Sequence, residues 1–152
     1  MKHRESEQTQ LRVSRLLNRD SVMLHAEMPS VQTALETLVE LQESNGVITN
    51  GTAYYKAVCE RERAGGTTAI GEGLAIPHAC NAGVASLGLA ALTLTRGLDW
   101  GAADGKLVDM IFMVAVPPDR QSDHRLTEKL RMADTREAFI RILNQTEAAI
   151  FA

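Results

Sequence analysis

The residues of this chain best suited to chemistry lie in one short segment that ends in a proline, a histidine and an alanine. The segment is Gly71-Glu72-Gly73-Leu74-Ala75-Ile76-Pro77-His78-Ala79. Its two glycines permit a tight bend in which backbone N–H groups can approach an anion. Pro77 cannot donate to a sheet ladder, so it belongs at a strand end or on a sheet edge. His78 is therefore expected at the mouth of a strand, as a nucleophile or ligand; a histidine without such neighbours would more simply be structural.

The residues that precede this segment extend the pattern. From Arg61 to His78 the chain reads Arg-Glu-Arg-Ala-Gly-Gly-Thr-Thr-Ala-Ile-Gly-Glu-Gly-Leu-Ala-Ile-Pro-His. This run resembles the signature of enzyme IIA domains of the fructose, mannitol and nitrogen-regulatory type in the bacterial phosphotransferase system. In that family an Arg-Glu pair ends a helix, a Thr-rich turn follows, and a Gly-x-Gly-x-Ala-Ile-Pro-His segment carries the phosphorylated histidine. Here Arg61 lies one residue farther from Thr68 than the expected spacing, so Arg63 is an alternative occupant of its place.

The resemblance implies that His78 is the phosphorylated nucleophile. Such a histidine attacks phosphorus with one ring nitrogen of a neutral imidazole and donates the other N–H, usually to a backbone carbonyl. The charge of the transferred group needs preorganised donors around it. Backbone N–H groups after Gly73, or around Ala79 and Cys80, are candidates for binding the phosphate. The Thr68 hydroxyl is another, unless it only caps the turn.

Two further side chains are candidates for contact with the phosphoryl group. His124 follows the Pro117-Pro118 loop, where the family has a histidine beside the phosphorylated one; its alternative role is that of a plain residue at a helix start. Arg61 is the candidate guanidinium, and its alternative role is that of a solvated cation at a helix C-terminus. The chain departs from the family in two places. Arg125 follows His124 where a leucine is usual, and the segment from His124 to Asp134 is shorter by about one helical turn.

Composition excludes several classes of protein. The chain has 152 residues, 45% of them hydrophobic and 23% charged, which suits one domain with a sizeable core. A net charge of −3 argues against a nucleic-acid binder, and no apolar run approaches the roughly 20 residues of a membrane span.

No metal or other cofactor is expected. The four histidines and two scattered cysteines outline no metal site. The absence of a phosphate-binding Gly-x-x-x-x-Gly-Lys loop argues against a nucleotide, so no cofactor is expected. Without a signal-peptide core at the N-terminus, a cytoplasmic location is expected.

The hydrophobic pattern predicts strands and helices that alternate along the chain. The strand over 107–116 is almost entirely apolar, so it should be central and buried on both faces. The predicted elements are strands over 21–26, 87–95 and 107–116, helices from Ser30 to Gly46 and over 52–64, and shorter helices over 11–18, from His124, from Asp134 and over 146–151. In the helix over 52–64, a shared face is expected for Tyr55, Val58, Cys59 and Glu62. His25 is expected to face solvent.

This alternation predicts an α/β fold, a single-domain sandwich with a mixed β-sheet flanked by helices. Residues 1–10 are polar and expected to be frayed. Residues 11–152 are expected to form one enzyme IIA-like phosphotransfer domain.

The resemblance implies a phosphoryl carrier that accepts phosphate on His78 from an HPr-type phosphohistidine protein. Because sugar-transport enzyme IIA domains are often fused to other domains, the free chain favours a regulatory target. Glu72, taken to be next to His78, would repel an acidic partner more after phosphorylation. The alternatives are a sugar-specific enzyme IIA that passes phosphate to a separate enzyme IIB, and a non-catalytic regulatory binding module. A hydrolase that uses His78 with Asp99 is disfavoured, since no serine or cysteine lies in an elbow motif; Asp99 and Asp104 are expected to make loop hydrogen bonds.

Overall fold

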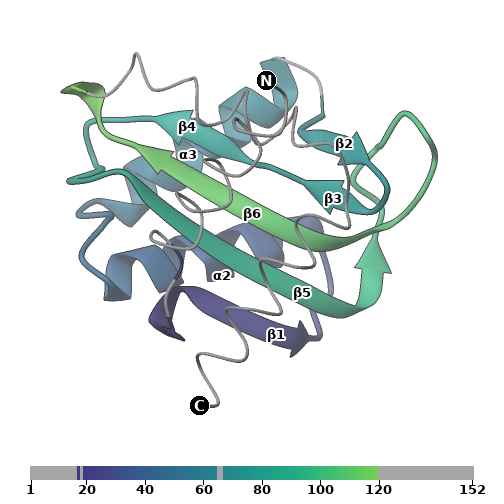
Figure 1. Cartoon of the computed structure of the whole chain (residues 1–152). Helices are drawn as coiled ribbons and strands as arrows, with labels where there is room; N and C mark the ends of the chain where they lie inside the picture. Colours follow the sequence, from purple (N-terminus) through teal and green to yellow (C-terminus); the bar gives the residue numbers. More distant parts are fainter. Residues whose placement is uncertain (1–16, 18, 65–66, 120–152) are drawn as a thin grey trace, which may run out of the picture.

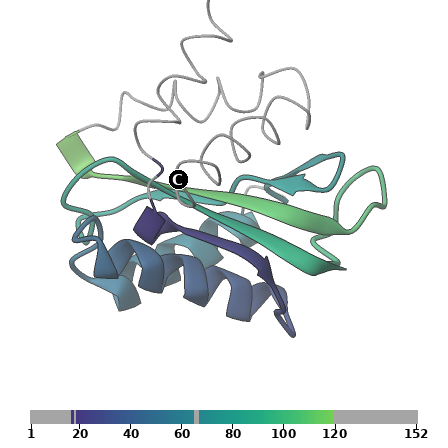
Figure 2. The same ribbon diagram turned by 60° about the horizontal axis from the view of Figure 1, so that its bottom comes forward.

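In the part of the chain that the structure describes, the fold is a mixed β-sheet with two α-helices packed on one of its faces (Figures 1 and 2). The computed structural model describes residues 17, 19–64 and 67–119. Within them the strand order is β1 (Val22–Ala26), β5 (Gly88–Leu98), β6 (Val108–Val116), β3 (Leu74–Ala75) and β2 (Ala69–Gly71), with β4 (His78–Cys80) also paired to β6. The predicted α/β architecture with a mixed sheet is confirmed. The helices predicted over 11–18 and beyond residue 123 lie outside the described residues.

Strand β6 is the centre of this sheet, as its apolar sequence predicts. It pairs antiparallel with β5 and parallel with β3 and β4. Its side chains alternate between two buried clusters: Ile111 and Met113 face the helices, whereas Phe112 and Val114 face the opposite side. Both faces are buried, which explains why no polar residue interrupts the alternation after Asp109.

The two helices begin and end close to the predicted positions. Helix α2 (Val31–Ser44) starts after Ser30, whose hydroxyl accepts the Thr33 N–H at 3.1 Å. It ends before Gly46, whose φ of +74° is a left-handed conformation that glycine adopts without strain. Helix α3 (Gly51–Ala64) follows directly. None of the described helices is long and apolar enough to cross a membrane.

The face that α3 buries differs from the predicted grouping. The buried residues of α3 are Gly51, Tyr54 and Val58, which lie three and four positions apart and so share the stripe that faces the sheet. Tyr55, grouped with Val58 in the prediction, is instead turned toward a second groove that Cys59 also lines. The hydrophobic pattern allows either of the two adjacent tyrosines to be the buried one. In the structure, Tyr54 packs against the sheet.

Strands β3 and β4 form one line along β6 that Pro77 divides. Leu74 pairs with Met110 and His78 with Val114, so the register is the same on both sides of the proline. Pro77 has no N–H to give to the ladder, but its carbonyl accepts the Val114 N–H at 3.0 Å. The prediction that Pro77 lies at a strand end is confirmed, and His78 begins the strand that follows.

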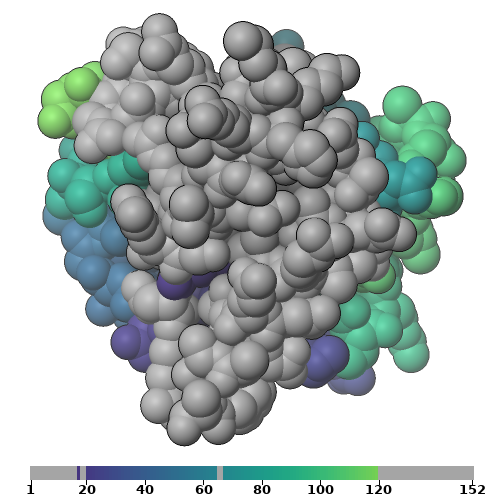
Figure 3. Space-filling model, viewed as in Figure 1, coloured from purple at the N-terminus to yellow at the C-terminus, as the bar shows by residue number. Residues whose placement is uncertain are grey.

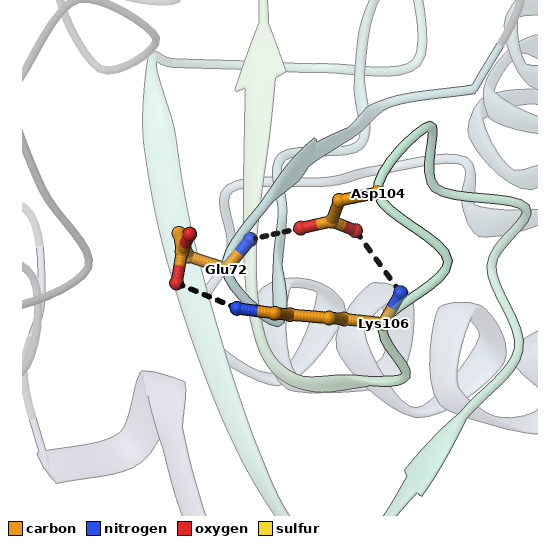
Figure 4. Close-up of polar contacts among 3 residues, drawn as sticks. All are labelled: Glu72, Asp104 and Lys106. Carbon is orange, nitrogen blue, oxygen red and sulfur yellow. Dashed lines mark hydrogen bonds and ion pairs between the residues drawn. The ribbon is translucent and has the colours of Figure 1, made fainter.

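A two-residue turn joins β2 to β3, with both residues in the left-handed region. Glu72 has φ +56° and Gly73 φ +77°. Asp104, in the loop between β5 and β6, accepts the N–H groups of Glu72 at 2.9 Å and of Lys106 at 3.0 Å, and Lys106 Nζ lies 3.1 Å from Glu72 Oε2 (Figure 4). In the space-filling view this teal turn and the green loop meet at one edge of the molecule (Figure 3).

The turn lies at the far end of the β3–β4 line from His78. Glu72 precedes β3, whereas His78 opens β4, and both strands run in the same direction along β6. The expectation that Glu72 is next to His78 is therefore wrong. In contrast, the expected loop hydrogen bonds of Asp99 and Asp104 are confirmed.

Replacing Asp104 with Asn should destabilise the fold in a pH-dependent way. The Glu72 and Lys106 N–H groups hold the pKa of the Asp104 carboxyl below its usual 3.8. A folded-state pKa that is lowered stabilises the fold above the unfolded value and loses this contribution as the pH falls through the folded value. Urea unfolding should therefore give a lower midpoint for Asp104→Asn near neutral pH, and a difference from wild type that shrinks under acid conditions.

Glu72→Gln is the matched control for this experiment. It removes the charge that pairs with Lys106 at the surface, where an ion pair contributes little to stability, and it keeps the backbone N–H that Asp104 accepts. Equal midpoints for wild type and Asp104→Asn near neutral pH would contradict the account of the turn.

Candidate functional site

His78 lies in a groove between α3 and β4 with a volume of about 390 Å³. The groove is lined by Ala57, Glu60, Arg61, Ala64, His78, Ala79, Cys80 and Val116. Helix α3 supplies the first four residues, and β4 supplies the next three from the opposite wall. The fold thus brings together two predicted site residues, Arg61 and His78, that are far apart in the sequence.

One ring nitrogen of His78 is held by the backbone of its own strand. Nδ1 lies 2.9 Å from the Ile76 carbonyl oxygen. Because a carbonyl only accepts hydrogen bonds, Nδ1 must carry the hydrogen, and in the neutral ring the lone pair is then on Nε2. The half-buried imidazole is therefore held in the tautomer in which Nε2 is the nucleophilic atom.

The geometry of α3 separates the two candidate arginines. Arg61 lines the groove with His78. Arg63, two positions along, lines a second groove of about 620 Å³, and its Nε donates to the Cys59 carbonyl at 3.4 Å. Residues two apart on a helix do not share a face. Arg61 is thus the arginine placed beside His78, and its contact with a phosphoryl group stays a prediction.

Thr68 is buried in a network that ties the end of α3 to the loop after β5. Its hydroxyl donates to the Glu62 carboxylate, which also accepts the Thr68 N–H at 3.3 Å, and the Trp100 indole N–H donates to the same hydroxyl at 3.3 Å. Only 1% of Thr68 is exposed, and it does not line the groove of His78. Its contact with phosphate stays a prediction.

Ala79 lines the groove, but its backbone N–H points toward β6, because β4 pairs with β6 with the Pro77 carbonyl accepting the Val114 N–H. Successive N–H groups of a strand point in opposite directions, so the N–H groups of His78 and Cys80 point away from β6. A phosphate contact by Ala79 stays a prediction. The analysis of the sequence gave Tyr54 no role, although its spacing from Gly51 and Val58 could have marked it as the buried tyrosine.

The remaining candidates are not placed beside His78. His124 lies outside the described residues. Asp99 lines the second groove, where its Oδ1 accepts the Gly101 N–H at 3.0 Å, so the described structure does not pair it with His78 as a hydrolase would require. Among the described residues, no group of three or more His, Cys, Asp or Glu side chains could hold a metal ion.

The chain matches the family model described as "Phosphoenolpyruvate-dependent sugar phosphotransferase system, EIIA 2" over residues 15–149. It belongs to this family. Enzyme IIA proteins are phosphotransfer proteins, which agrees with the resemblance of the segment around His78. One relative is the fructose-specific EIIA component of Haloferax volcanii, 32% identical over 70% of this chain and 72% of that protein.

Other relatives include both sugar-transport and regulatory proteins. The 2-O-alpha-mannosyl-D-glycerate-specific EIIABC component of Escherichia coli is 34% identical over 72% of this chain, and the nitrogen regulatory protein of the same species is 29% identical over 91% of it. The chain spans 93% of that regulatory protein, but only 17% of this EIIABC component and 23% of the fructose-specific EIIABC component of Bacillus subtilis.

Solved structures of enzyme IIA proteins share the fold. The nitrogen regulatory protein IIA-Ntr of Neisseria meningitidis has a TM-score of 0.71 at 28% identity. The match covers 78% of this chain and 81% of the Neisseria chain. The mannitol IIA of Escherichia coli has a TM-score of 0.62 at 18% identity, over 84% of this chain and 98% of its own.

Proposed function

We propose that this chain accepts a phosphoryl group on Nε2 of His78 from an HPr-type phosphohistidine protein and uses it for regulation. The observation that carries the proposal is the 2.9 Å contact between His78 Nδ1 and the Ile76 carbonyl, in a groove shared with Arg61. The groove thus contains a nucleophile whose reactive atom is defined, and a cation whose charge is opposite to that of a phosphoryl group. The domain spanning 11–152 and the cytoplasmic location are parts of the same proposal.

The transfer needs no nucleotide, because the donor already carries an activated phosphoryl group. The lone pair of Nε2 attacks phosphorus, and the P–N bond of the carrier breaks with its electron pair returning to the carrier's imidazole. The hydrogen on Nδ1 remains bonded to the Ile76 carbonyl throughout. The product is a phosphohistidine of the same bond type, so the transfer is close to balanced in free energy.

The donors around the transferred group come from both walls of the groove. The Arg61 guanidinium can neutralise the phosphoryl oxygens through charge-assisted hydrogen bonds. The N–H of Ala79 points toward β6, so the outward N–H of Cys80 is the better-placed backbone donor. We assign His124 the role of a second imidazole donor by family resemblance, and Thr68 mainly a structural role.

The regulatory output is supported by similarity at nearly full length. The nitrogen regulatory protein of Escherichia coli matches 91% of this chain and 93% of itself. The sugar-specific alternative also has support. The mannitol-specific enzyme IIA component of Staphylococcus aureus is 28% identical over 90% of this chain and 92% of its own length, and one solved structure is a complex of the mannitol IIA of Escherichia coli with its phosphorylated enzyme IIB.

Phosphorylation would change the charge of the surface around His78. It adds close to two negative charges to a groove that already contains Glu60. The adjacent lining residues Ala57, Ala64 and Val116 are small and apolar, so a partner can approach the ring closely. The phosphate would add to the repulsion that Glu60, rather than Glu72, exerts on an acidic partner, so such a partner would bind the unphosphorylated form better.

His78→Ala should abolish acid-labile phosphorylation by a phosphorylated HPr-type carrier and leave the fold intact, because it removes the nucleophile. His25→Ala is the matched control, since His25 is exposed on β1, and it should be labelled like wild type. Labelling is measured with radioactive phosphate on the full chain. Retained labelling of His78→Ala would place the nucleophile elsewhere.

Arg61→Gln should slow the transfer by about 10²-fold, the usual cost of removing one donor to a developing negative charge. Arg63→Gln removes the same charge from the same helix but from the second groove, and it should transfer at the wild-type rate. Rapid-quench single-turnover kinetics give both rates. Equal rates for the two variants would make Arg61 a solvated cation.

Binding of the regulatory target should depend on the state of His78. In a pull-down from the source cell, wild type, His78→Ala and His78→Asp serve as baits, and the acidic variant should capture less of the target. If a sugar-permease enzyme IIB is the specific partner and its binding is indifferent to these substitutions, the sugar-specific alternative is correct.

A further inference from the structure

A buried tyrosine bonds to β6 beside His78. Tyr54, on α3, has none of its surface exposed. Its hydroxyl donates to the Val114 carbonyl at 2.8 Å, the point of β6 toward which strand pairing directs the backbone N–H of Ala79. Val114 is the register partner of His78 on β6. One side chain from the helix layer therefore bonds to β6 at the point where β6 pairs with β4, level with the proposed phosphoryl acceptor.

The phenol keeps its hydrogen under all ordinary conditions. Burial raises the pKa of Tyr54 far above its usual value. A neutral hydroxyl can donate a hydrogen bond, which is the role that the Val114 carbonyl requires. The hydroxyl therefore keeps the hydrogen that it donates to Val114.

The strand needs this support because Pro77 interrupts its pairing. Proline gives no N–H to the ladder, so between β3 and β4 the chain is held to β6 through the Pro77 carbonyl, which accepts the Val114 N–H at 3.0 Å. The next attachment along the chain is at Ala79, where β4 pairs with β6 beside the Val114 carbonyl that accepts the Tyr54 hydroxyl. His78 lies between these two points, and Tyr54 contributes to the second of them.

The ring of His78 depends on this backbone geometry. Its Nδ1 bonds to the carbonyl of Ile76, only two residues earlier, so the bond forms only if the backbone from Ile76 to His78 keeps its extended shape. A shift of the peptide between His78 and Ala79 would move the ring and lengthen the bond. The tautomer that leaves the lone pair on Nε2 would then lose its stabilisation.

We propose that Tyr54 is a positioning residue for phosphoryl transfer, which holds β4 against β6 so that His78 keeps its Nδ1 hydrogen bond and presents Nε2. This inference rests on the proposed function of His78. Tyr54 is fully buried and does not line the groove. Its effect is therefore on the rate of transfer within the docked complex and not on the docking itself.

The test compares Tyr54→Phe with Tyr55→Phe in the full chain. Both variants lose one hydroxyl from adjacent positions of α3, but Tyr55 lines the second groove and not that of His78. Tyr54→Phe should fold, because it keeps the buried ring and because the Ala79 N–H and the Val114 carbonyl belong to paired strands. Circular dichroism and urea unfolding check this point for both variants.

Two readouts separate positioning from stability. In ¹⁵N NMR of the unphosphorylated protein, the ring nitrogens of His78 should show a single tautomer, with the hydrogen on Nδ1, in wild type and Tyr55→Phe, and a mixture in Tyr54→Phe. In single-turnover transfer from a phosphorylated HPr-type carrier, Tyr54→Phe should have a maximal rate roughly 3- to 10-fold lower, the effect expected for one hydrogen bond. The half-saturating carrier concentration should be unchanged.

Each outcome has a distinct meaning. A Tyr54→Phe variant with the wild-type tautomer and the wild-type maximal rate would overturn the inference. So would a changed half-saturating concentration at an unchanged maximal rate, which indicates docking. If wild type itself takes no phosphoryl group while the tautomers differ as predicted, the proposed function fails and the positioning role of Tyr54 stands.

Discussion

The hydrogen bond between His78 Nδ1 and the Ile76 carbonyl is the contact on which the site depends. It fixes which nitrogen carries the hydrogen, and so which nitrogen can attack phosphorus. The bond requires an extended backbone across Pro77, and the central strand β6 holds that backbone through Val114 on one side of the proline and Ile111 on the other. The apolar sheet thus determines which nitrogen of the half-buried His78 imidazole can react.

Helix α3 is the second structural requirement, because it contributes to the site from two directions. Arg61 faces the groove from the C-terminal half of the helix, and Tyr54 reaches the backbone of β6 at Val114, the register partner of His78. Glu62, on the same helix, fixes the turn that leads into β2 through its bonds to Thr68. The position of α3 against the sheet therefore determines where Arg61 lies, how the strand at His78 is supported, and how the turn before β2 is held.

Much of this arrangement could be predicted from the sequence, where neighbouring residues decide the structure. Ser30 as an N-cap, Pro77 at a strand end and β6 as a central strand all follow from local chemistry and hydrophobic pattern. The choice of Tyr54 over Tyr55, and of Arg61 over Arg63, depends on the rotation of α3 against the sheet, which no local pattern contains. The prediction that Glu72 lies next to His78 failed for a similar reason. The two residues are only six positions apart in the sequence, but the chain between them is extended and separates them by the length of a strand.

The most direct test of this account is the position of the phosphoryl group on the ring of His78. NMR of the ¹⁵N-labelled chain, phosphorylated by an HPr-type carrier, resolves the coupling between phosphorus and each ring nitrogen. The account predicts coupling to Nε2, with Nδ1 still bearing the hydrogen that it donates to Ile76. Coupling to Nδ1 would contradict it, because that nitrogen could not then make the bond that orients the ring.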